Sequence, residues 1–387
     1  MNSNDASSPR RLLYVVNEDW AFLLNRLPMA RAARKAGFEV HVATHVNSGA
    51  DAIEAEDFEL HPIPLQRGGI SPRAAMPAVL ALRRVEQQVK PDIVHHSGLQ
   101  CSVLGSVAAL GSKVPQVNAL TGLGYVFTST SSRTRLLRQI LKWVLPALLG
   151  RPGRVVLVQN PDDRAALLDL GIKRERMVLI PGSGVDTDAL RPLSEPEGPI
   201  TYGFAGRLLT DKGIRALVAA HEIVRGEDLK TNLIIAGNPD PANPASVSLE
   251  EVKEWSSRPG ITWLGHVEDI ASLWRRCHFA ILPSHREGLP GSLMEAAACE
   301  RALIATDAPG CREIVIHDQT GLLVPIEDPK ALAAAIVKLA TSPDLRARYG
   351  KAARELVVGR LSAKIIGDSI VRLYDELTVV PADTLRL

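Results

Sequence analysis

The sequence predicts an α/β protein built from two doubly wound, Rossmann-like domains that face a central cleft. Short, β-branched apolar runs recur between helix-like segments, as in repeated βαβ units. This pattern stops at a proline-rich segment and then begins again, which indicates two domains. Hydrophobic residues make up 46% of the 387 positions but aromatic residues only 4%, a mixture typical of parallel sheets covered by helices.

Residues 1–190 are predicted to form the first domain. Its apolar runs have strand length and are followed by helix-like sequence, such as MARAARKAG at 29–37. The expected strands lie at residues 11–16, 39–44, 92–96, 115–120 and 154–159.

Residues 191–361 are predicted to form the second domain, which begins with the linker-like segment RPLSEPEGP at 191–199. A helical tail lies within 362–387. Since open parallel sheets bind ligands at the carboxyl ends of their strands, the loops after the strands are the places to search for a site. The expected strands lie at residues 200–205, 232–236, 261–264, 278–282, 302–305 and 321–324.

Composition argues against several classes of protein. The four cysteines form no CxxC pair, and no histidine stands at zinc-ligand spacing from them, so neither a disulfide framework nor a structural metal is expected. The apolar run at 12–16 is too short for a signal peptide core or a membrane span. We therefore expect a cytoplasmic protein.

The motif GRLLTDKG at residues 206–213 follows one predicted strand and precedes a helix. Gly206 lets the backbone approach a ligand, while Arg207 and Lys212 place two cations beside a helix N-terminus. This combination suits an anion such as a diphosphate. The alternative is a solvated loop with two ordinary surface cations.

Two glutamates, Glu287 and Glu295, stand eight positions apart in EGLPGSLMEAAAC. Pro290 suits the first turn of a helix, so Glu287 is predicted in a loop and Glu295 inside the helix. They can then contact different parts of one elongated ligand, and a carboxylate suits a vicinal diol such as that of ribose. Alternatively, Glu295 is an ordinary helix-surface residue. Backbone N–H groups that could meet an anion or sugar hydroxyls belong to Gly288, Leu289 and Gly291.

These motifs, together with DAPGCREIV and TGLLVP, resemble the retaining glycosyltransferases of family 4, which have the GT-B fold. The resemblance covers nearly the whole chain. The start of the chain, VVNEDWAFLLNRLPMARAARKAGFEVHVAT, and NALTGLGYVFTS at 118–129 are similar to the subgroup that builds bacterial surface polysaccharides and lipid-linked glycans.

The resemblance implies a role for each matching residue. Arg207 and Lys212 would bind the diphosphate of a nucleotide sugar, expected to be a UDP-sugar, and neutralise the leaving group. Glu295 would bind the ribose, and Glu287 with the backbone of residues 288–291, including Pro290, would hold the donor sugar. Residues 183–186 look like the hinge-side segment, and the last helix would return to the first domain.

The expected acceptor is a polyprenyl-diphosphate-linked glycan. Because Arg207 and Lys212 can stabilise the leaving diphosphate, no cofactor and no divalent metal ion is expected. The sequence DTD at 186–188 matches the metal-binding signature of another glycosyltransferase fold, but it stands at the linker and is discounted.

Two segments depart from the pattern of the family. Many relatives have a Gly-Gly turn after the first strand, where this chain has Asn17, Glu18 and Asp19. Many also have a catalytic histidine where this chain has TGLG at 121–124. His95 and His96 could compensate, or could be structural, so the general base stays open. The sequence also leaves open the nucleotide base, the sugar, the acceptor, the linkage and the oligomeric state.

Residues 131–154 form a predicted basic amphipathic helix with Trp143 near its middle. No acidic residue occurs between Asp92 and Asp162, so the helix is suited to an anionic membrane interface. We expect peripheral binding to the inner face of the plasma membrane. The alternative is a core-facing helix with a solvated basic face. Its apolar positions are Leu137, Ile140, Leu141, Val144, Leu145 and Leu148.

Three other functions compete with glycosyl transfer. A glycoside hydrolase could use Glu287 and Glu295 as acid and nucleophile, but this leaves Arg207 and Lys212 unexplained. A nucleotide-sugar epimerase could share the fold. A non-catalytic nucleotide-sugar-binding protein would explain the two departures at residues 17–19 and 121–124.

Overall fold

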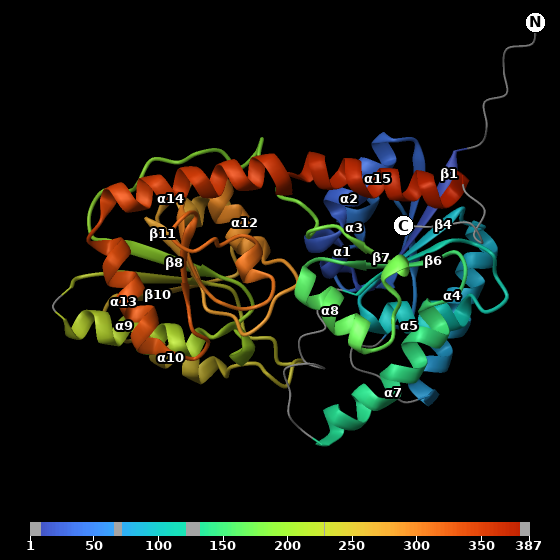
Figure 1. The fold of residues 1–387 in the computed structure, drawn as a ribbon, viewed down its shortest axis with the longest axis horizontal. Coiled ribbons are helices and arrows are strands. Elements are labelled where there is room, and N and C mark those ends of the chain that lie inside the picture. Colours follow the sequence, from blue (N-terminus) through green and yellow to red (C-terminus); the bar gives the residue numbers. More distant parts are fainter. Residues whose placement is uncertain (1–8, 66–71, 121–131, 228, 380–387) are drawn as a thin grey trace, which may run out of the picture. The chain divides into compact units, whose positions relative to one another are not determined.

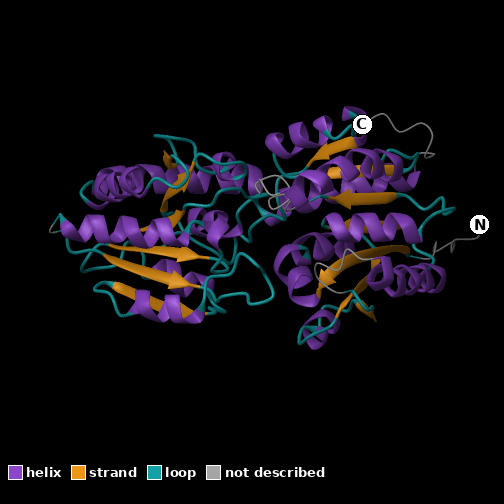
Figure 2. Ribbon diagram, turned by 90° about the horizontal axis from the view of Figure 1, so that it is seen from below, coloured by secondary structure: helices purple, strands orange, loops and turns teal. Residues whose placement is uncertain are grey.

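The computed structural model describes residues 9–65, 72–120, 132–227 and 229–379. The chain divides into two compact units, which Figure 1 draws in sequence colours. Unit 1 comprises residues 1–183 and 366–387, and unit 2 comprises residues 184–365. Each unit is a parallel sheet with helices on both faces (Figure 2), so the predicted fold class is confirmed.

The sheet of unit 1 has seven strands in the order β3-β2-β1-β4-β5-β6-β7. The strands are β1 (Arg10–Glu18), β2 (Phe38–His45), β3 (Glu59–Pro62), β4 (Ile93–Ser97), β5 (Gln116–Ala119), β6 (Arg154–Val158) and β7 (Met177–Leu179). The helices are α1 (Asp19–Asn25), α2 (Leu27–Lys35), α3 (Ala50–Glu54), α4 (Pro72–Val89), α5 (Leu99–Ala108), α7 (Ser132–Leu149) and α8 (Pro161–Asp169).

The sheet of unit 2 has six strands in the order β10-β9-β8-β11-β12-β13. The strands are β8 (Thr201–Ala205), β9 (Asn232–Ala236), β10 (Ile261–Gly265), β11 (Phe279–Leu282), β12 (Ala302–Thr306) and β13 (Gly321–Val324). The helices are α9 (Ile214–Gly226), α10 (Leu249–Ser256), α11 (Ile270–Arg275), α12 (Gly291–Ala298), α13 (Pro329–Ala340) and α14 (Pro343–Leu356).

The apolar runs in the sequence arise because each central strand is covered on both faces. In β1, Leu12 and Tyr14 belong to one buried cluster, while Leu13 and Val15 belong to another. Successive side chains of a strand point to opposite faces, so a strand between two helical layers must be apolar at every position.

The polar segment 191–199 is not the linker that its composition indicated. Arg301 donates hydrogen bonds to the carbonyl groups of Leu193 and Ser194, and Arg346 forms a two-pronged ion pair with Glu195. These contacts hold the segment on unit 2. The first division between the units therefore lies at residues 183 and 184, before the predicted boundary at 190.

The second division lies at residues 365 and 366, within helix α15 (Ala363–Val379). On the side of unit 2, the N–H of Val185 donates to Leu361 and the N–H of Ala363 donates to Val185. The two connections thus leave unit 2 side by side. On the side of unit 1, Gly367 of α15 lies against Ala32 of α2, and Ile370 and Tyr374 of α15 join the buried cluster around Tyr14. Figure 1 shows α15 as the last helix of the chain.

Candidate functional site

The ends of β8 and β9 in unit 2 come so close together that only glycine fits between them. The N–H of Gly206 donates to the carbonyl of Ala236, and a Cβ atom on Gly237 would lie 1.8 Å from the carbonyl oxygen of Gly206. Gly237 also has φ +130°, which side-chain-bearing residues rarely adopt. The approach fixes where the loop at residues 206–213 begins.

Arg207 is the first cation of this loop. Its guanidinium forms an ion pair with Asp240 at 2.9 Å, and 43% of the Arg207 side chain stays exposed. Asp240 belongs to the loop that follows β9, the strand next to β8. Sequence reasoning missed this residue, although its place after a strand was a signal that could have found it.

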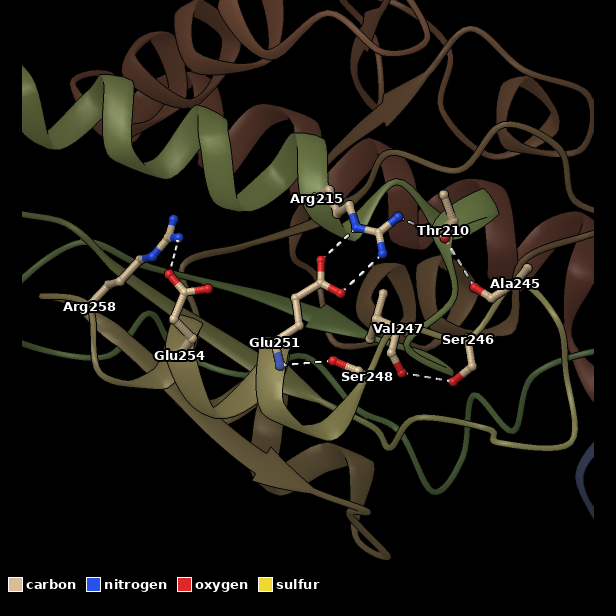
Figure 3. Close-up of polar contacts among 9 residues, drawn as sticks. All are labelled: Thr210, Arg215, Ala245, Ser246, Val247, Ser248, Glu251, Glu254 and Arg258. Carbon is tan, nitrogen blue, oxygen red and sulfur yellow. Dashed lines mark hydrogen bonds and ion pairs between the residues drawn. The ribbon is translucent and has the colours of Figure 1, made fainter.

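The far end of the loop is held by the polar contacts in Figure 3. The hydroxyl of Thr210 donates to the carbonyl of Ala245 at 3.1 Å and accepts a hydrogen bond from Arg215, also at 3.1 Å. Arg215 is fixed in turn by both carboxylate oxygens of Glu251, at 2.6 and 3.0 Å. The loop is therefore braced from α9 and α10.

Lys212 and Glu287 are brought together directly. The Lys212 Nζ atom lies 2.5 Å from Glu287 Oε1, and the side chains are only 20% and 11% exposed. The hydroxyl of Ser284 donates to the same carboxylate oxygen at 2.6 Å. The backbone N–H of Glu287 donates to Pro309, so the loop after β11 carries a fixed carboxylate against a fixed cation.

Glu295 lies on α12, as predicted, and in a different environment from Glu287. Helix α12 begins at Gly291 with Pro290 as its N-cap, so Glu287, Gly288 and Leu289 lie in the preceding loop. The Glu295 side chain is partly buried, and this burial raises the pKa of its carboxyl group to about 7. Within the described parts of the chain its carboxyl group makes no hydrogen bond or ion pair. A carboxyl group without such partners is suited to bind a ligand.

The sequence departs from the family pattern at residues 17–19, and no loop separates the elements there: Asn17 and Glu18 belong to β1, and Asp19 is the first residue of α1. Although burial acts to raise the pKa of Asp19, four hydrogen bonds outweigh it and keep the pKa below its usual value. The donors are the N–H groups of Trp20, Asn47 and Gly49 and the side-chain amide of Asn47. This carboxylate therefore ties the start of α1 to the loop after β2.

The histidines His95 and His96 are structural. Both are completely buried, and burial lowers the pKa of each. The Nδ1 atom of His95 lies 2.6 Å from the hydroxyl of Tyr374, and that of His96 lies 2.9 Å from the Asn118 side-chain oxygen. The segment TGLG at 121–124 lies outside the described residues.

The sequence DTD at 186–188 forms a turn. A side-chain oxygen of Asp186 accepts hydrogen bonds from the N–H groups of Asp188 and Ala189, at 3.0 and 2.9 Å. The carboxylate thus has a local structural role, which agrees with setting the motif aside.

Leucines of α7 pack into the core of unit 1, which agrees with the alternative of a core-facing helix with a solvated basic face. Leu141, Leu145 and Leu149 are buried in a cluster with residues of β6 and α8. Ile140 is 49% exposed and Trp143 80% exposed, so the outward apolar surface is narrower than predicted. In the part of the chain that the structure describes, no helix has both the length and the apolarity needed to span a membrane.

Both halves of the chain match family models of glycosyltransferases. Residues 11–148 match the family described as "Glycosyl transferase 4-like", and residues 199–342 match "Glycosyl transferases group 1". Together the matches cover most of the chain. It belongs to the family-4-like glycosyltransferases with the GT-B fold.

Two similar proteins with curated names are also glycosyltransferases. The N,N'-diacetylbacillosaminyl-diphospho-undecaprenol alpha-1,3-N-acetylgalactosaminyltransferase of Campylobacter jejuni is 23% identical, over 91% of this chain and 95% of its own. The capsular polysaccharide biosynthesis glycosyltransferase CapM of Staphylococcus aureus is 22% identical, over 88% and 91%.

Solved structures of this fold include sucrose-phosphate synthase from Thermosynechococcus elongatus, with a TM-score of 0.80 and 21% identity over 95% of this chain and 99% of that one. The Anabaena protein HepE in complex with UDP-glucose has a TM-score of 0.77 and 17% identity, over 95% and 99%. Because the chain belongs to this family, it is a glycosyltransferase and not a hydrolase, an epimerase or a non-catalytic binding protein.

The close approach of β8 and β9 predicts that Gly237→Ala disrupts this glycosyltransferase. The new methyl group would push the Gly206 carbonyl away and displace the loop that carries Arg207. We expect a loss of about 2 kcal/mol or more in the free energy of unfolding, measured with urea.

Gly226→Ala, at the end of α9, is the matched control. No atom lies within 4 Å of its added Cβ atom, and the residue is helical, so the variant should be neutral or slightly more stable. Equal stabilities of the two variants would contradict the steric argument.

Proposed function

We propose that the protein is a retaining glycosyltransferase that moves a sugar from a UDP-sugar to a lipid-linked or polysaccharide acceptor in bacterial surface glycan biosynthesis. The observation that carries the proposal is the set of groups after the strands of unit 2. It comprises two cations at Arg207 and Lys212, a fixed carboxylate at Glu287 and, at Glu295, a carboxyl group that has no hydrogen-bond or ion-pair partner among the described residues. The relatives named for capsule and undecaprenol-linked glycan synthesis support the kind of acceptor.

In this proposal, the diphosphate of the donor binds Arg207 and Lys212. Each cation is paired with a carboxylate in the structure, so the donor exchanges one anionic partner for another. Charge grows on the diphosphate as the bond to the sugar breaks, and the cations act where that charge develops. No metal ion or other cofactor is then required. Gly206 allows the backbone to approach the phosphates.

The two glutamates bind the other parts of the donor, which are the ribose and the sugar. The ionised carboxylate of Glu295 accepts hydrogen bonds from the ribose hydroxyls. Glu287, which keeps the hydrogen bond from Ser284 when Lys212 binds the diphosphate, and the backbone of Gly288 to Gly291 bind the sugar. Departure of the diphosphate and attack by the acceptor occur on the same face of the sugar, which gives retention without a protein nucleophile.

Unit 1 would bind the acceptor, a polyprenyl-diphosphate-linked glycan, at the cytoplasmic face of the membrane. Trp143 and Ile140 are exposed on α7, and the same helix carries the exposed cations Arg135 and Lys142. An exposed tryptophan on a helix with exposed basic residues suits the interface of an anionic bilayer.

Replacing the cations tests the diphosphate site. A thermal-shift comparison of UDP-, GDP- and ADP-sugars first identifies the donor, because a ligand that binds the folded state raises its stability. We then expect Arg207→Ala combined with Lys212→Ala to lower kcat roughly 100-fold or more, since charge stabilisation in the transition state is lost. Transfer to an undecaprenyl-diphosphate-linked saccharide is the measurement.

Arg258→Ala is the control, because it removes a partly exposed cation that pairs with Glu222 and Glu254 and not with the loop at residues 206–213. Figure 3 shows the pair of Arg258 with Glu254. The control variant should transfer sugar at the wild-type rate. Turnover within a few-fold of wild type in the double variant would refute the diphosphate role.

The raised pKa of Glu295 predicts that donor binding depends on pH. Only the ionised carboxylate accepts both ribose hydrogen bonds, so UDP-sugar affinity should rise about tenfold per unit up to about pH 7 and then level off. Titration calorimetry across about pH 6 to 8 measures this. Glu295→Gln should bind roughly tenfold or more weakly and lose the pH dependence.

Glu355→Gln, an exposed position on α14, provides the control and should keep the wild-type profile. A wild-type affinity that is flat across this range, or a Glu295→Gln variant with unchanged affinity, would remove the ribose role.

The exposed apolar side chains of α7 predict membrane binding. Ile140→Ala combined with Trp143→Ala should reduce co-sedimentation with phosphatidylglycerol vesicles roughly tenfold, because less apolar area enters the interface. Leu24→Ala, on the 68% exposed Leu24 of α1, should bind like wild type. Equal binding of all three proteins would exclude this surface of α7.

A further inference from the structure

A group of metal-ligating side chains lies at the edge of the sheet in unit 1, outside the proposed transfer site. Strands β2 and β3 pair in parallel, with His41 opposite Glu59 and Ala43 opposite His61. Residues two apart on a strand share a face, so His41, Glu59 and His61 lie on the same face of the sheet. Both histidines are buried, whereas the side chain of Glu59 is 56% exposed.

The distances within this group are those of ligands around one ion. His41 Nδ1 lies 3.1 Å from His61 Nε2, and Glu59 oxygens lie 3.3 Å from His41 Nδ1 and 3.7 Å from His61 Nε2. Two ligands bound to tetrahedral zinc at about 2.0–2.1 Å are about 3.3–3.4 Å apart. An ion can therefore enter with small movements of the three side chains.

We propose that His41 Nδ1, His61 Nε2 and the carboxylate of Glu59 bind one divalent transition-metal ion, of which Zn²⁺ fits the ligand set best. Two imidazoles and one carboxylate are a common zinc set, and they leave a fourth position for water. The exposed Glu59 gives the ion access from solvent. No step of sugar transfer passes through this site.

The surroundings of His41 support the proposal. Its other ring nitrogen, Nε2, lies 3.2 Å from a carboxylate oxygen of Glu39 but is not aligned for a hydrogen bond, so this buried nitrogen is unsatisfied. Histidines that bind metals usually donate their second N–H to a carboxylate. The other oxygen of Glu39 lies 3.5 Å from Arg11, which holds it at this position.

The imidazole of His61 is also suited to binding in its protonation state. Burial lowers the pKa of His61, against the opposing effect of Glu59, so the ring stays neutral near pH 7. A neutral imidazole offers the lone pair that a metal needs. Without a metal, the two rings would instead share a single hydrogen bond.

A metal ion at this site would connect strands β2 and β3 at the edge of the sheet. Strand β3 has only four residues and pairs with β2 alone. Ligands from both strands would join them through the ion, so metal binding should stabilise this edge.

The test uses the full chain without a polyhistidine tag, after treatment with a chelator. Wild-type protein should bind one equivalent of Co²⁺ with the visible absorption of a four-coordinate ion, and Zn²⁺ should displace it. Glu59→Gln should bind Zn²⁺ at least roughly tenfold more weakly in titration calorimetry, and His61→Gln should lose the absorption. Glu39→Gln should weaken binding roughly tenfold.

Glu54→Gln, at an exposed position on α3, is the matched control and should bind as wild type does. Because Glu59 is exposed, Glu59→Gln should fold and transfer sugar normally, so a failure of metal binding is separable from a failure of the transferase proposal. Absence of Co²⁺ absorption and of Zn²⁺ heat in the wild type would overturn the site. The proposed site would also be overturned if Glu59→Gln and His61→Gln both bound the metal ion as the wild type does.

Discussion

Parallel strand pairing is the constraint on which the rest of each unit depends. Parallel strands must be joined by crossovers, and these crossovers place helices on both faces of the sheet. All carboxyl ends then meet at one edge. In unit 2 this brings the loops after β8, β9 and β11 together, although they are separated by long stretches of sequence. Arg207, Asp240 and Glu287 come from these three loops.

At the edge of the unit 2 sheet where the strands end, the two cations have carboxylate partners, whereas the Glu295 carboxyl group has none among the described residues. Arg207 and Lys212 each have a carboxylate partner, which removes part of the cost of keeping a cation in a partly buried place. Glu295 has no such partner among the residues described, and burial instead shifts its pKa toward neutrality. A donor that brings both anionic phosphates and neutral hydroxyls can satisfy both arrangements at once.

Unit 1 uses polar residues for a different purpose. Asp19, the first residue of α1, binds the loop after β2 by accepting hydrogen bonds, and His95 and His96 fill the interior beside Tyr374 and Asn118. Where many relatives have glycine after the first strand, this chain has a carboxylate that fixes the start of its first helix. The departure at residues 17–19 therefore has a structural role in this unit.

The sequence by itself determined the fold class, the strands other than β3 and β7, and the positions of the two motifs proposed to bind the donor. Apolar periodicity and glycine-rich strand ends are local signals, so they can be read without a structure. Tertiary structure decided which residues meet. The segment 191–199 looked like a linker, but buried Arg301 and Arg346 hold it. The leucines of α7 looked free for a membrane, but Leu141 and Leu145 are in the core.

Partner choice was equally invisible in the sequence. Asp240 pairs with Arg207 across 33 positions, and His41 meets His61 because β2 and β3 pair in one particular register. Spacing along the chain carries no information on such pairs, since strand order and register arise only when the sheet forms.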